Sequence, residues 1–206
     1  MKILFIDTST LYLNIAIIED DKIIFNHKEK VEKDMSSKII PIIDSGFKKC
    51  SFNIKDINKI FVVNGPGSFT GVRIGVTVAK TIAWSLNIDL IPLSSLEFIA
   101  STNSSKKYRV PMIDARRGNV FAGIYDENLF NIFPDQLISY EQLSKKIDES
   151  YEQISYHLEN NLKPDGNIIK VINKHLLDIP INPHLLKPNY LKLTEAEEKL
   201  NDQRDK

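Results

Sequence analysis

The stretch Gly65–Gly75, which reads GPGSFTGVRIG, follows a short apolar run and opens a longer run with helical spacing. Its glycines permit backbone conformations that other residues avoid, and they leave amide N–H groups uncovered. A helix that begins with uncovered amides offers a site for an anion. The stretch therefore predicts a buried strand over 59–63, a tight turn and a helix over 70–86, which is a strand-turn-helix unit of an α/β fold.

Two interpretations of this turn stay open on the sequence alone. In the first, the loop cradles a phosphate or a nucleotide. In the second, it is a tight strand-to-helix turn that Ser68 or Thr70 caps. The loop lacks the lysine of a Walker motif, so a P-loop assignment fails. The phosphate or nucleotide contacts predicted by the first interpretation are Asp7, Thr8, Ser9, Gly65, Gly67 and Ser68.

The predicted helix carries small residues at every fourth position, namely Gly71, Gly75, Ala79 and Ala83. Glycine inside a helix costs about 1 kcal/mol relative to alanine, so two glycines need a structural reason. Close approach of another backbone is the usual reason. That backbone belongs either to a partner helix or to a neighbouring element of the same chain, and the spacing favours neither.

The same order of predicted elements occurs twice along the chain. Apolar strands over 2–6 and 109–113 both end at an aspartate, and both precede a strand meander and a helix. This order predicts an α/β protein with an actin-like (ASKHA) fold of two ribonuclease-H-like lobes, each a mixed sheet flanked by helices. The predicted lobes are residues 1–103 and a smaller one of residues 104–206, whose C-terminal helix over 194–200 is free to pack back on the first lobe. Other predicted elements include a helix over 140–150 and a strand over 168–172.

A polar turn follows the first strand of each lobe. Asp7-Thr8-Ser9-Thr10 occupies the place where ATPases of the actin-like superfamily hold metal and phosphate, but a capped turn explains the same residues and is favoured. In the second lobe, Arg116 and Arg117 are predicted to contact phosphate or a partner carboxylate. The alternative for this pair is a solvated hairpin tip with a local ion pair.

The composition limits the classes of function. Lysine plus arginine and aspartate plus glutamate number 27 each in 206 residues, so no broad basic field is available to hold a nucleic acid without help. A single cysteine, Cys50, excludes an internal disulfide and fits a reducing compartment. The four histidines are not spaced as a helical zinc pair, and no metal site is predicted. Without a long apolar run, we expect a cytoplasmic protein with no membrane contact.

The sequence resembles the TsaB (YeaZ) family of bacterial tRNA threonylcarbamoyladenosine biosynthesis proteins. The resemblance rests on five stretches that keep the family's order: Ile6–Thr10 (IDTST), Gly65–Gly75, Ser94–Leu96 (SSL), Asp114–Gly118 (DARRG) and Pro188–Lys192 (PNYLK).

The resemblance implies an actin-like protein with no catalytic activity and no cofactor of its own. In this family the catalytic paralogue TsaD carries the metal and transfers the threonylcarbamoyl group, and the ATPase TsaE joins the pair. ATP and the metal ion therefore belong to partner subunits, and tRNA meets this chain only through the complex. Carried over from the family, the partner interface comprises Met35, Ile39, Ile43, Gly71, Arg73, Gly75 and Ala79. On this basis Gly75→Leu is expected to block pairing and to leave the monomer folded.

Two other functions stay open at the level of sequence. One is an ATP-dependent phosphotransferase or ATPase of the actin-like class, with Asp7 and the Gly65–Gly71 loop holding metal and phosphate. The other is a self-contained homodimer that acts as a regulatory binding module. The sequence does not decide whether the resting form is a monomer or a homodimer.

Overall fold

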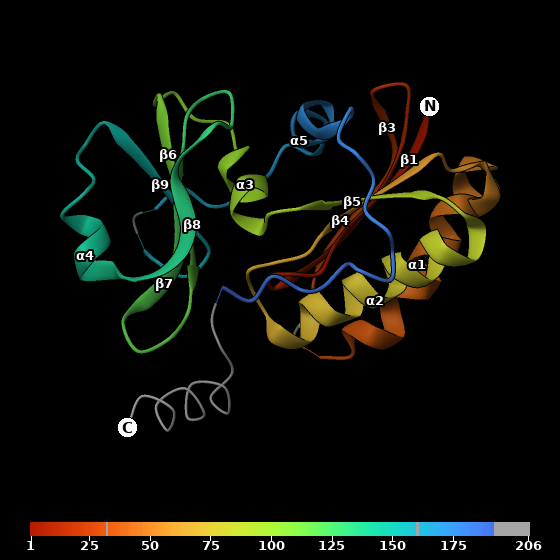
Figure 1. The fold of residues 1–206 in the computed structure, drawn as a ribbon, viewed down its shortest axis with the longest axis horizontal. Coiled ribbons are helices and arrows are strands. Elements are labelled where there is room, and N and C mark those ends of the chain that lie inside the picture. Colours follow the sequence, from red (N-terminus) through yellow and green to blue (C-terminus); the bar gives the residue numbers. More distant parts are fainter. Residues whose placement is uncertain (32, 160, 192–206) are drawn as a thin grey trace.

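The computed structural model describes residues 1–31, 33–159 and 161–191, which form two lobes side by side (Figure 1). The first lobe is built on a five-stranded sheet in the order β3-β2-β1-β4-β5, and the second on a four-stranded sheet in the order β8-β7-β6-β9. The strands of the first sheet are β1 (Lys2–Asp7), β2 (Tyr12–Glu19), β3 (Lys22–Lys30), β4 (Lys59–Val63) and β5 (Asp89–Leu93). The strands of the second sheet are β6 (Tyr108–Asp114), β7 (Asn119–Tyr125), β8 (Asn131–Ser139) and β9 (Tyr151–Ser155).

Both lobes follow one plan. β1 runs antiparallel to β2 and parallel to β4, and β6 runs antiparallel to β7 and parallel to β9. In each lobe a three-stranded meander is therefore followed by a helix and a parallel strand. The predicted α/β fold of two mixed-sheet lobes is confirmed. The first sheet ends at Leu93 and the second begins at Tyr108, while the division at residue 103 stays a prediction.

Two long helices cover one face of the first sheet (Figure 1). The helices are α1 (Met35–Cys50), α2 (Phe69–Leu86), α3 (Ser95–Ala100), α4 (Tyr140–Ser144) and α5 (Ile168–His175), with a short 3-10 helix η1 (Ile54–Asp56). Because side chains alternate along a strand, Leu4 and Ile6 of β1 pack beneath α1 and α2, whereas Phe5 packs in the core shared with the second lobe. No helix among the residues described is long and apolar enough to cross a membrane.

Helices α3 and α5 join the lobes. The ring of Phe98 in α3 packs against Phe5 of β1 with 5.1 Å between centroids. Glu97 of α3 is only 5% exposed and accepts hydrogen bonds from Lys174 and from Nε2 of His175, the latter at 2.8 Å. The hydrogen bond from His175 to the Glu97 carboxylate holds the pKa of His175 above its ordinary value. An apolar core and a buried ion cluster thus fix the lobe junction together.

Residues 181–191, here called the strap, return from the second lobe across the first and run beside α2 (Figure 1). The strap begins where the Ile181 N–H donates to the Leu90 carbonyl at 2.9 Å. Leu186 is 2% exposed and anchors its middle, and the Asn189 N–H donates to the Asn64 carbonyl at 2.7 Å. The strap therefore reaches the glycine-rich loop. The predicted C-terminal helix over 194–200 lies outside the described residues.

The second lobe departs from the predicted elements in three places. The predicted strand over 168–172 is wrong, because these residues belong to α5. The buried positions of α5, 168, 171 and 172, have helical spacing. The Asn167 side chain caps the helix by accepting a hydrogen bond of 3.0 Å from the Lys170 N–H. The predicted helix over 140–150 ends at Ser144, and β9 was not predicted.

Candidate functional site

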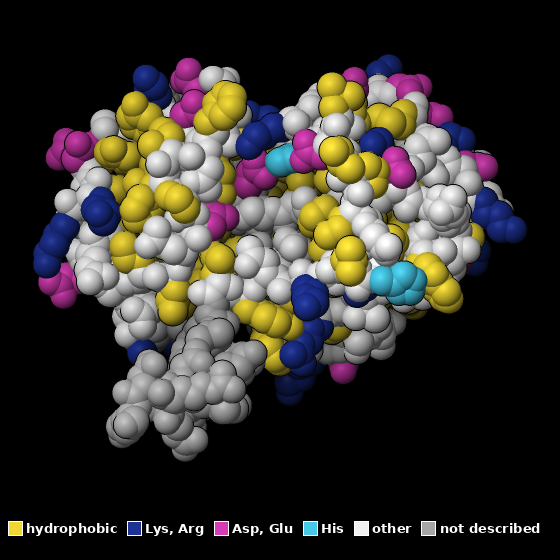
Figure 2. Space-filling model, in the orientation of Figure 1, with side chains coloured by type: hydrophobic (Ala, Val, Ile, Leu, Met, Phe, Trp, Pro, Cys, Tyr) yellow, Lys and Arg dark blue, Asp and Glu magenta, His cyan; other side chains and the backbone are white. Residues whose placement is uncertain are grey.

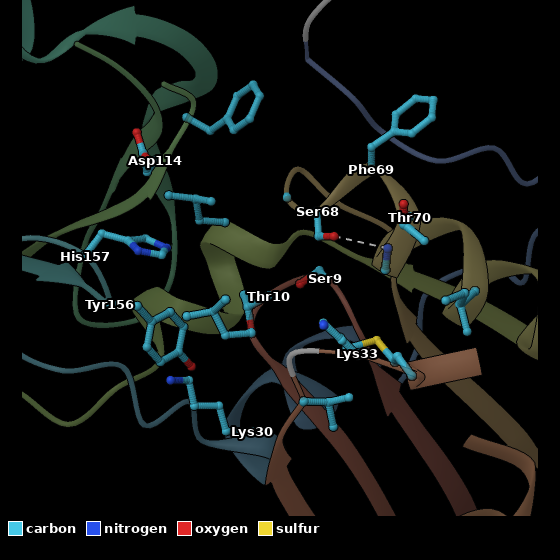
Figure 3. A pocket seen from close by; sticks show the side chains of 18 of the residues that line it. Ser9, Thr10, Lys30, Lys33, Ser68, Phe69, Thr70, Asp114, Tyr156 and His157 are labelled. Carbon is cyan, nitrogen blue, oxygen red and sulfur yellow. Dashed lines mark hydrogen bonds between the residues drawn. The ribbon is translucent and has the colours of Figure 1, made fainter. Parts of the chain in front are cut away.

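A cleft of about 1180 Å³ lies between the lobes, beside the glycine-rich loop (Figure 3). The first lobe contributes the turn after β1, the loop at residues 67–71 and the segment that leads into α1. The second lobe contributes the turn after β6 and the residues that follow β9. The polar residues that line it include Ser9, Thr10, Lys33, Ser68, Arg116, Tyr156 and His157.

The glycine-rich loop is held tightly against the chain's own backbone. A Cβ at Gly67 would lie 2.1 Å from the Ser9 carbonyl oxygen, and one at Gly65 would lie 2.4 Å from that of Asn189. The Ser68 N–H donates to the Ser9 carbonyl at 2.8 Å, and the Ser68 hydroxyl caps α2 with a hydrogen bond of 3.2 Å. The capped-turn interpretation therefore describes the local structure. Contact of this loop with a phosphate stays a prediction.

The small residues of α2 face inward. A Cβ at Gly71 would lie 2.1 Å from the Thr8 carbonyl oxygen, and one at Gly75 would lie 2.3 Å from Thr8 Oγ1. The Thr8 hydroxyl donates to the Gly71 carbonyl at 2.7 Å, and Ala79 is fully buried. The backbone that approaches α2 is thus the chain's own turn after β1. The interpretation of this stripe as a partner-docking edge is wrong, because its residues pack within the chain, and Gly75→Leu is now expected to destabilise the monomer.

The same correction applies to most of the predicted partner interface. Ile39 and Ile43 of α1 are 1% and 3% exposed, because their shared face packs on the sheet. With Gly71, Gly75 and Ala79 they belong to the interior of the first lobe. Met35 is half-buried at the cleft and Arg73 is exposed on α2. Partner contact by Met35 and Arg73 stays a prediction.

Asp7 ends β1 with its carboxylate turned into the protein. The residue is 3% exposed, and its Oδ1 accepts hydrogen bonds from the Ser9 N–H at 2.8 Å and the Ser9 hydroxyl at 2.7 Å. Burial raises the pKa of Asp7 to about 6, although the bonds from Ser9 oppose this shift. No group of three or more His, Cys, Asp or Glu side chains in the described part of the chain could hold a metal ion. Asp7 is therefore not part of such a group within the described residues.

The turn after β6 presents arginine at the opposite wall of the cleft. Arg116 and Arg117 adopt left-handed conformations with φ of 68° and 53°, and the Arg116 N–H donates to Asp114 Oδ1 at 2.8 Å. Arg116 lines the cleft, and Arg117 is exposed beside it. Lys30, Lys33 and Arg116 line the cleft together with Asp34 and Asp114, so its charged side chains are mixed with a small excess of cations. Contact with tRNA or a partner stays a prediction for both arginines.

Tyr156 and His157 were missed from the sequence. They follow β9 and face the first lobe across the cleft (Figure 3). The Tyr156 ring lies 5.2 Å from that of Tyr12, and burial raises the pKa of its hydroxyl. Prediction of the preceding strand, Tyr151–Ser155, would have located these two residues, but that strand is short and mostly polar.

Comparisons with known proteins find the TsaB proteins and the related TsaD family model. The family model described as TsaD, tRNA N6-adenosine threonylcarbamoyltransferase, matches residues 22–180. The chain is 34% identical to the tRNA threonylcarbamoyladenosine biosynthesis protein TsaB of Bacillus subtilis (strain 168), over 97% of each chain. It is 33% identical to TsaB of Escherichia coli (strain K12) over 62% of this chain and 57% of that protein.

The chain belongs to the TsaB family. It therefore takes part in the biosynthesis of threonylcarbamoyladenosine in tRNA. Solved structures agree on the fold: YeaZ from Pseudomonas aeruginosa superposes with a TM-score of 0.77 at 19% identity, covering 92% of this chain and 99% of that one. A second Pseudomonas aeruginosa structure, titled as an uncharacterized protein with similarity to peptidase YEAZ, gives 0.80 at 19% identity over 93% and 99%. The two-lobed α/β fold and the family resemblance are both confirmed.

Proposed function

We propose that this TsaB-family protein is a non-catalytic cytoplasmic subunit of the machinery that attaches threonylcarbamoyl to a tRNA adenosine next to the anticodon. It pairs with the catalytic paralogue TsaD, and the ATPase TsaE joins the pair. ATP and the metal ion are held by those subunits, and tRNA meets this chain only through the complex. The chain acts by binding one arrangement of TsaD more tightly than others, since only differential affinity shifts such an equilibrium.

The turned-in carboxylate of Asp7 carries the proposal. Related ATPases use an aspartate at this place to hold metal, but here its Oδ1 accepts two hydrogen bonds from Ser9 and the residue is 3% exposed. The adjacent Thr8 is fully buried and hydrogen-bonded to α2. A cleft without an available carboxylate at this turn supports a binding role rather than phosphoryl transfer.

Surface exposure supports a pairing face on the outer side of α1 and α2. Ile40 of α1 is 52% exposed, and Ile74 and Val78 of α2, a helix that contacts α1, are half-buried. Partly exposed aliphatic side chains on two packed helices supply the apolar area that a stable interface needs. This face replaces the inward stripe as the proposed contact with TsaD.

Reconstitution tests the proposal. TsaD of the same host, TsaE, ATP, threonylcarbamoyl donor and unmodified tRNA are assayed for modified adenosine with and without this chain. We expect activity only when the chain is present, and no ATP hydrolysis by the chain alone. ATP hydrolysis by the purified chain that Asp7→Asn abolishes would support the phosphotransferase alternative instead.

A pair of matched variants locates the pairing face in the same assay. Ile40→Asp is expected to weaken TsaD binding at least tenfold, because it places a charge in an apolar contact. Ile179→Asp is the control, since Ile179 is 92% exposed and belongs to neither helix. Equal binding by the two variants would remove α1 from the interface, and a chain that elutes as a tight homodimer and ignores TsaD would contradict the pairing itself.

A further inference from the structure

Arg73 projects from α2 and is held in one position by two aromatic residues. Its guanidinium lies 3.7 Å from the centre of the Phe69 ring, and its Nε donates a hydrogen bond of 2.6 Å to the Tyr190 hydroxyl. Phe69 and Tyr190 stack on each other with 4.9 Å between centroids. Within the described part of the chain, the two Nη nitrogens of Arg73 have no hydrogen-bond partner, and no carboxylate pairs with the residue. Its neighbours thus hold the Arg73 side chain in place, while its Nη donors make no hydrogen bond within the described residues.

The two described segments that hold Arg73 and Tyr190 carry no acidic side chain. The segments α2 and the strap contain no Asp or Glu, although the whole chain has 27. They do contain the cations Arg73, Lys80 and Lys187, of which Lys80 binds the Leu186 carbonyl at 2.8 Å. Figure 2 shows Lys and Arg side chains gathered over the strap and the N-terminal half of α2, beside hydrophobic ones. This surface complements a negatively charged partner.

We propose that Arg73 is a preformed binding site for a carboxylate side chain of a partner protein. The two unused Nη nitrogens form a planar fork that matches a carboxylate with two parallel hydrogen bonds. Because Phe69 and Tyr190 already restrict the side chain, binding loses little rotamer entropy. The inference deepens the proposed pairing and rests on it for the identity of the partner, TsaD.

Apolar contacts accompany this fork on the same side of α2. Trp84 is 64% exposed and Leu185 of the strap is 66% exposed. Trp84 lies eleven residues beyond Arg73, which is roughly 16 Å along a helix and within one ordinary protein interface. A fixed cation beside exposed large apolar side chains is the composition of a protein-binding patch.

A phosphate would also match the fork, but the aromatic residues argue against RNA. Sequence-tolerant RNA binding needs aromatic faces that are free to stack on bases. The Phe69 ring is already flanked by Arg73 and Tyr190, and Trp84 is contacted edge-on by His184 at 5.6 Å. The net charge of zero gives no general attraction to a phosphate backbone. A protein carboxylate is therefore the favoured ligand.

Binding measurements on four variants test the fork against simple charge. Arg73→Gln is expected to weaken TsaD binding roughly 10- to 100-fold, and Arg73→Lys to lose most of the same affinity because it keeps the charge without the fork. Tyr190→Phe keeps the ring and removes the hydroxyl that orients Nε, so a loss of about threefold is expected. Lys187→Ala is the matched control, a cation of the strap without the aromatic clamp, and is expected to change affinity less than about twofold.

Three results would overturn the inference. Arg73→Lys binding TsaD as tightly as the unchanged protein would show that charge alone suffices. An equal loss in Lys187→Ala would show a diffuse basic surface rather than a fork. Weaker binding of labelled tRNA by Arg73→Gln, with TsaD pairing unchanged, would assign the site to phosphate. Thermal unfolding of each variant checks that the strap remains in place.

A peptide selection tests the inference without TsaD, so that its failure differs from failure of the proposed function. Random displayed peptides are selected on the unchanged full chain and on Arg73→Gln. We expect aspartate- or glutamate-containing peptides on the unchanged chain and their loss on the variant. If the chain fails to pair with TsaD but selects such peptides, the proposed function fails and the carboxylate site stands. If acidic peptides are not enriched on the unchanged chain, the proposed carboxylate site is wrong, whether or not the chain pairs with TsaD.

Discussion

The two lobes contain the same turn and use it differently. After β1, Asp7 Oδ1 accepts a hydrogen bond of 2.8 Å from the N–H two residues on, and after β6, Asp114 Oδ1 does the same at 2.8 Å. Yet Asp7 is 3% exposed, whereas Asp114 is exposed at the rim of the cleft. One local geometry has become part of the core in the first lobe and part of the surface in the second.

The difference arises from what covers each turn. In the first lobe the 18-residue helix α2 lies on Thr8 through Gly71 and Gly75. In the second lobe the counterpart of α2, which follows the parallel strand β9, is α5 with only eight residues, and a Cβ at Gly118 would meet nothing within 4 Å. Changes to the first turn should therefore alter the stability of the protein through packing and burial. Changes to the second turn should alter the stability of the protein only through backbone conformation.

The largest effect is expected where α2 meets the first turn. Gly75→Leu places a side chain against Thr8 Oγ1, which lies 2.3 Å from the new Cβ, and disrupts the Thr8–Gly71 hydrogen bond. We expect a loss of about 4 kcal/mol in unfolding free energy, some 3 from overpacking and 1 from the hydrogen bond. Urea unfolding measures it. Thr77→Leu, on the exposed side of α2, is the control and should change stability by less than about 0.5 kcal/mol.

The next largest effect is a pH dependence of the unfolding free energy, which we expect from Asp7 and not from Asp114. The folded pKa of Asp7, about 6, lies above the ordinary 3.8, so between these values the folded state binds more protons than the unfolded state. Stability from this group is therefore fully present below pH 3.8 and is lost as the pH rises to 6. Asp7→Asn keeps an acceptor for Ser9 without the charge. It should raise the unfolding free energy by roughly 2 to 3 kcal/mol at pH 8 and hardly at all at pH 4.

Asp114→Asn is the control for this pH dependence, because its exposed carboxylate has water available in both states. Its urea unfolding at pH 4 and pH 8 should match that of the unchanged protein within about 0.5 kcal/mol. A gain at pH 8 as large as that of Asp7→Asn would mean that the two turns are buried alike, which would break the comparison.

Much of the first lobe could be predicted because its signals are local. The apolar run before Gly65 and the helical spacing after it gave β4 and α2 within one residue at either end. The meander of β1, β2 and β3 followed from short apolar segments separated by polar turns. The family motifs also lie mostly in this lobe, so the resemblance and the fold supported each other.

The predictions that failed have a common physical cause. The spacing of residues in the sequence does not show which distant segment of the chain they contact. The four-residue stripe correctly indicated a close approach to Gly71 and Gly75, but the approaching atoms are the carbonyl oxygen and the hydroxyl of Thr8, more than sixty positions earlier in the chain. β9 exists because it pairs in parallel with β6, a non-local contact that its own sequence does not encode. Tyr156 and His157 were lost from the predicted site along with that strand.

The smallest effect is expected in the second turn, where only backbone conformation is at stake. Gly118 has a φ of 74° and open space where a Cβ would lie. Gly118→Ala should therefore lower the unfolding free energy by about 1 kcal/mol, which is a few degrees in the melting temperature of a chain this long. Gly118→Asn should cost less, because asparagine tolerates the left-handed region. A loss above about 2 kcal/mol that is equal in both variants would reveal steric contact rather than backbone strain, and the second turn would then be packed like the first.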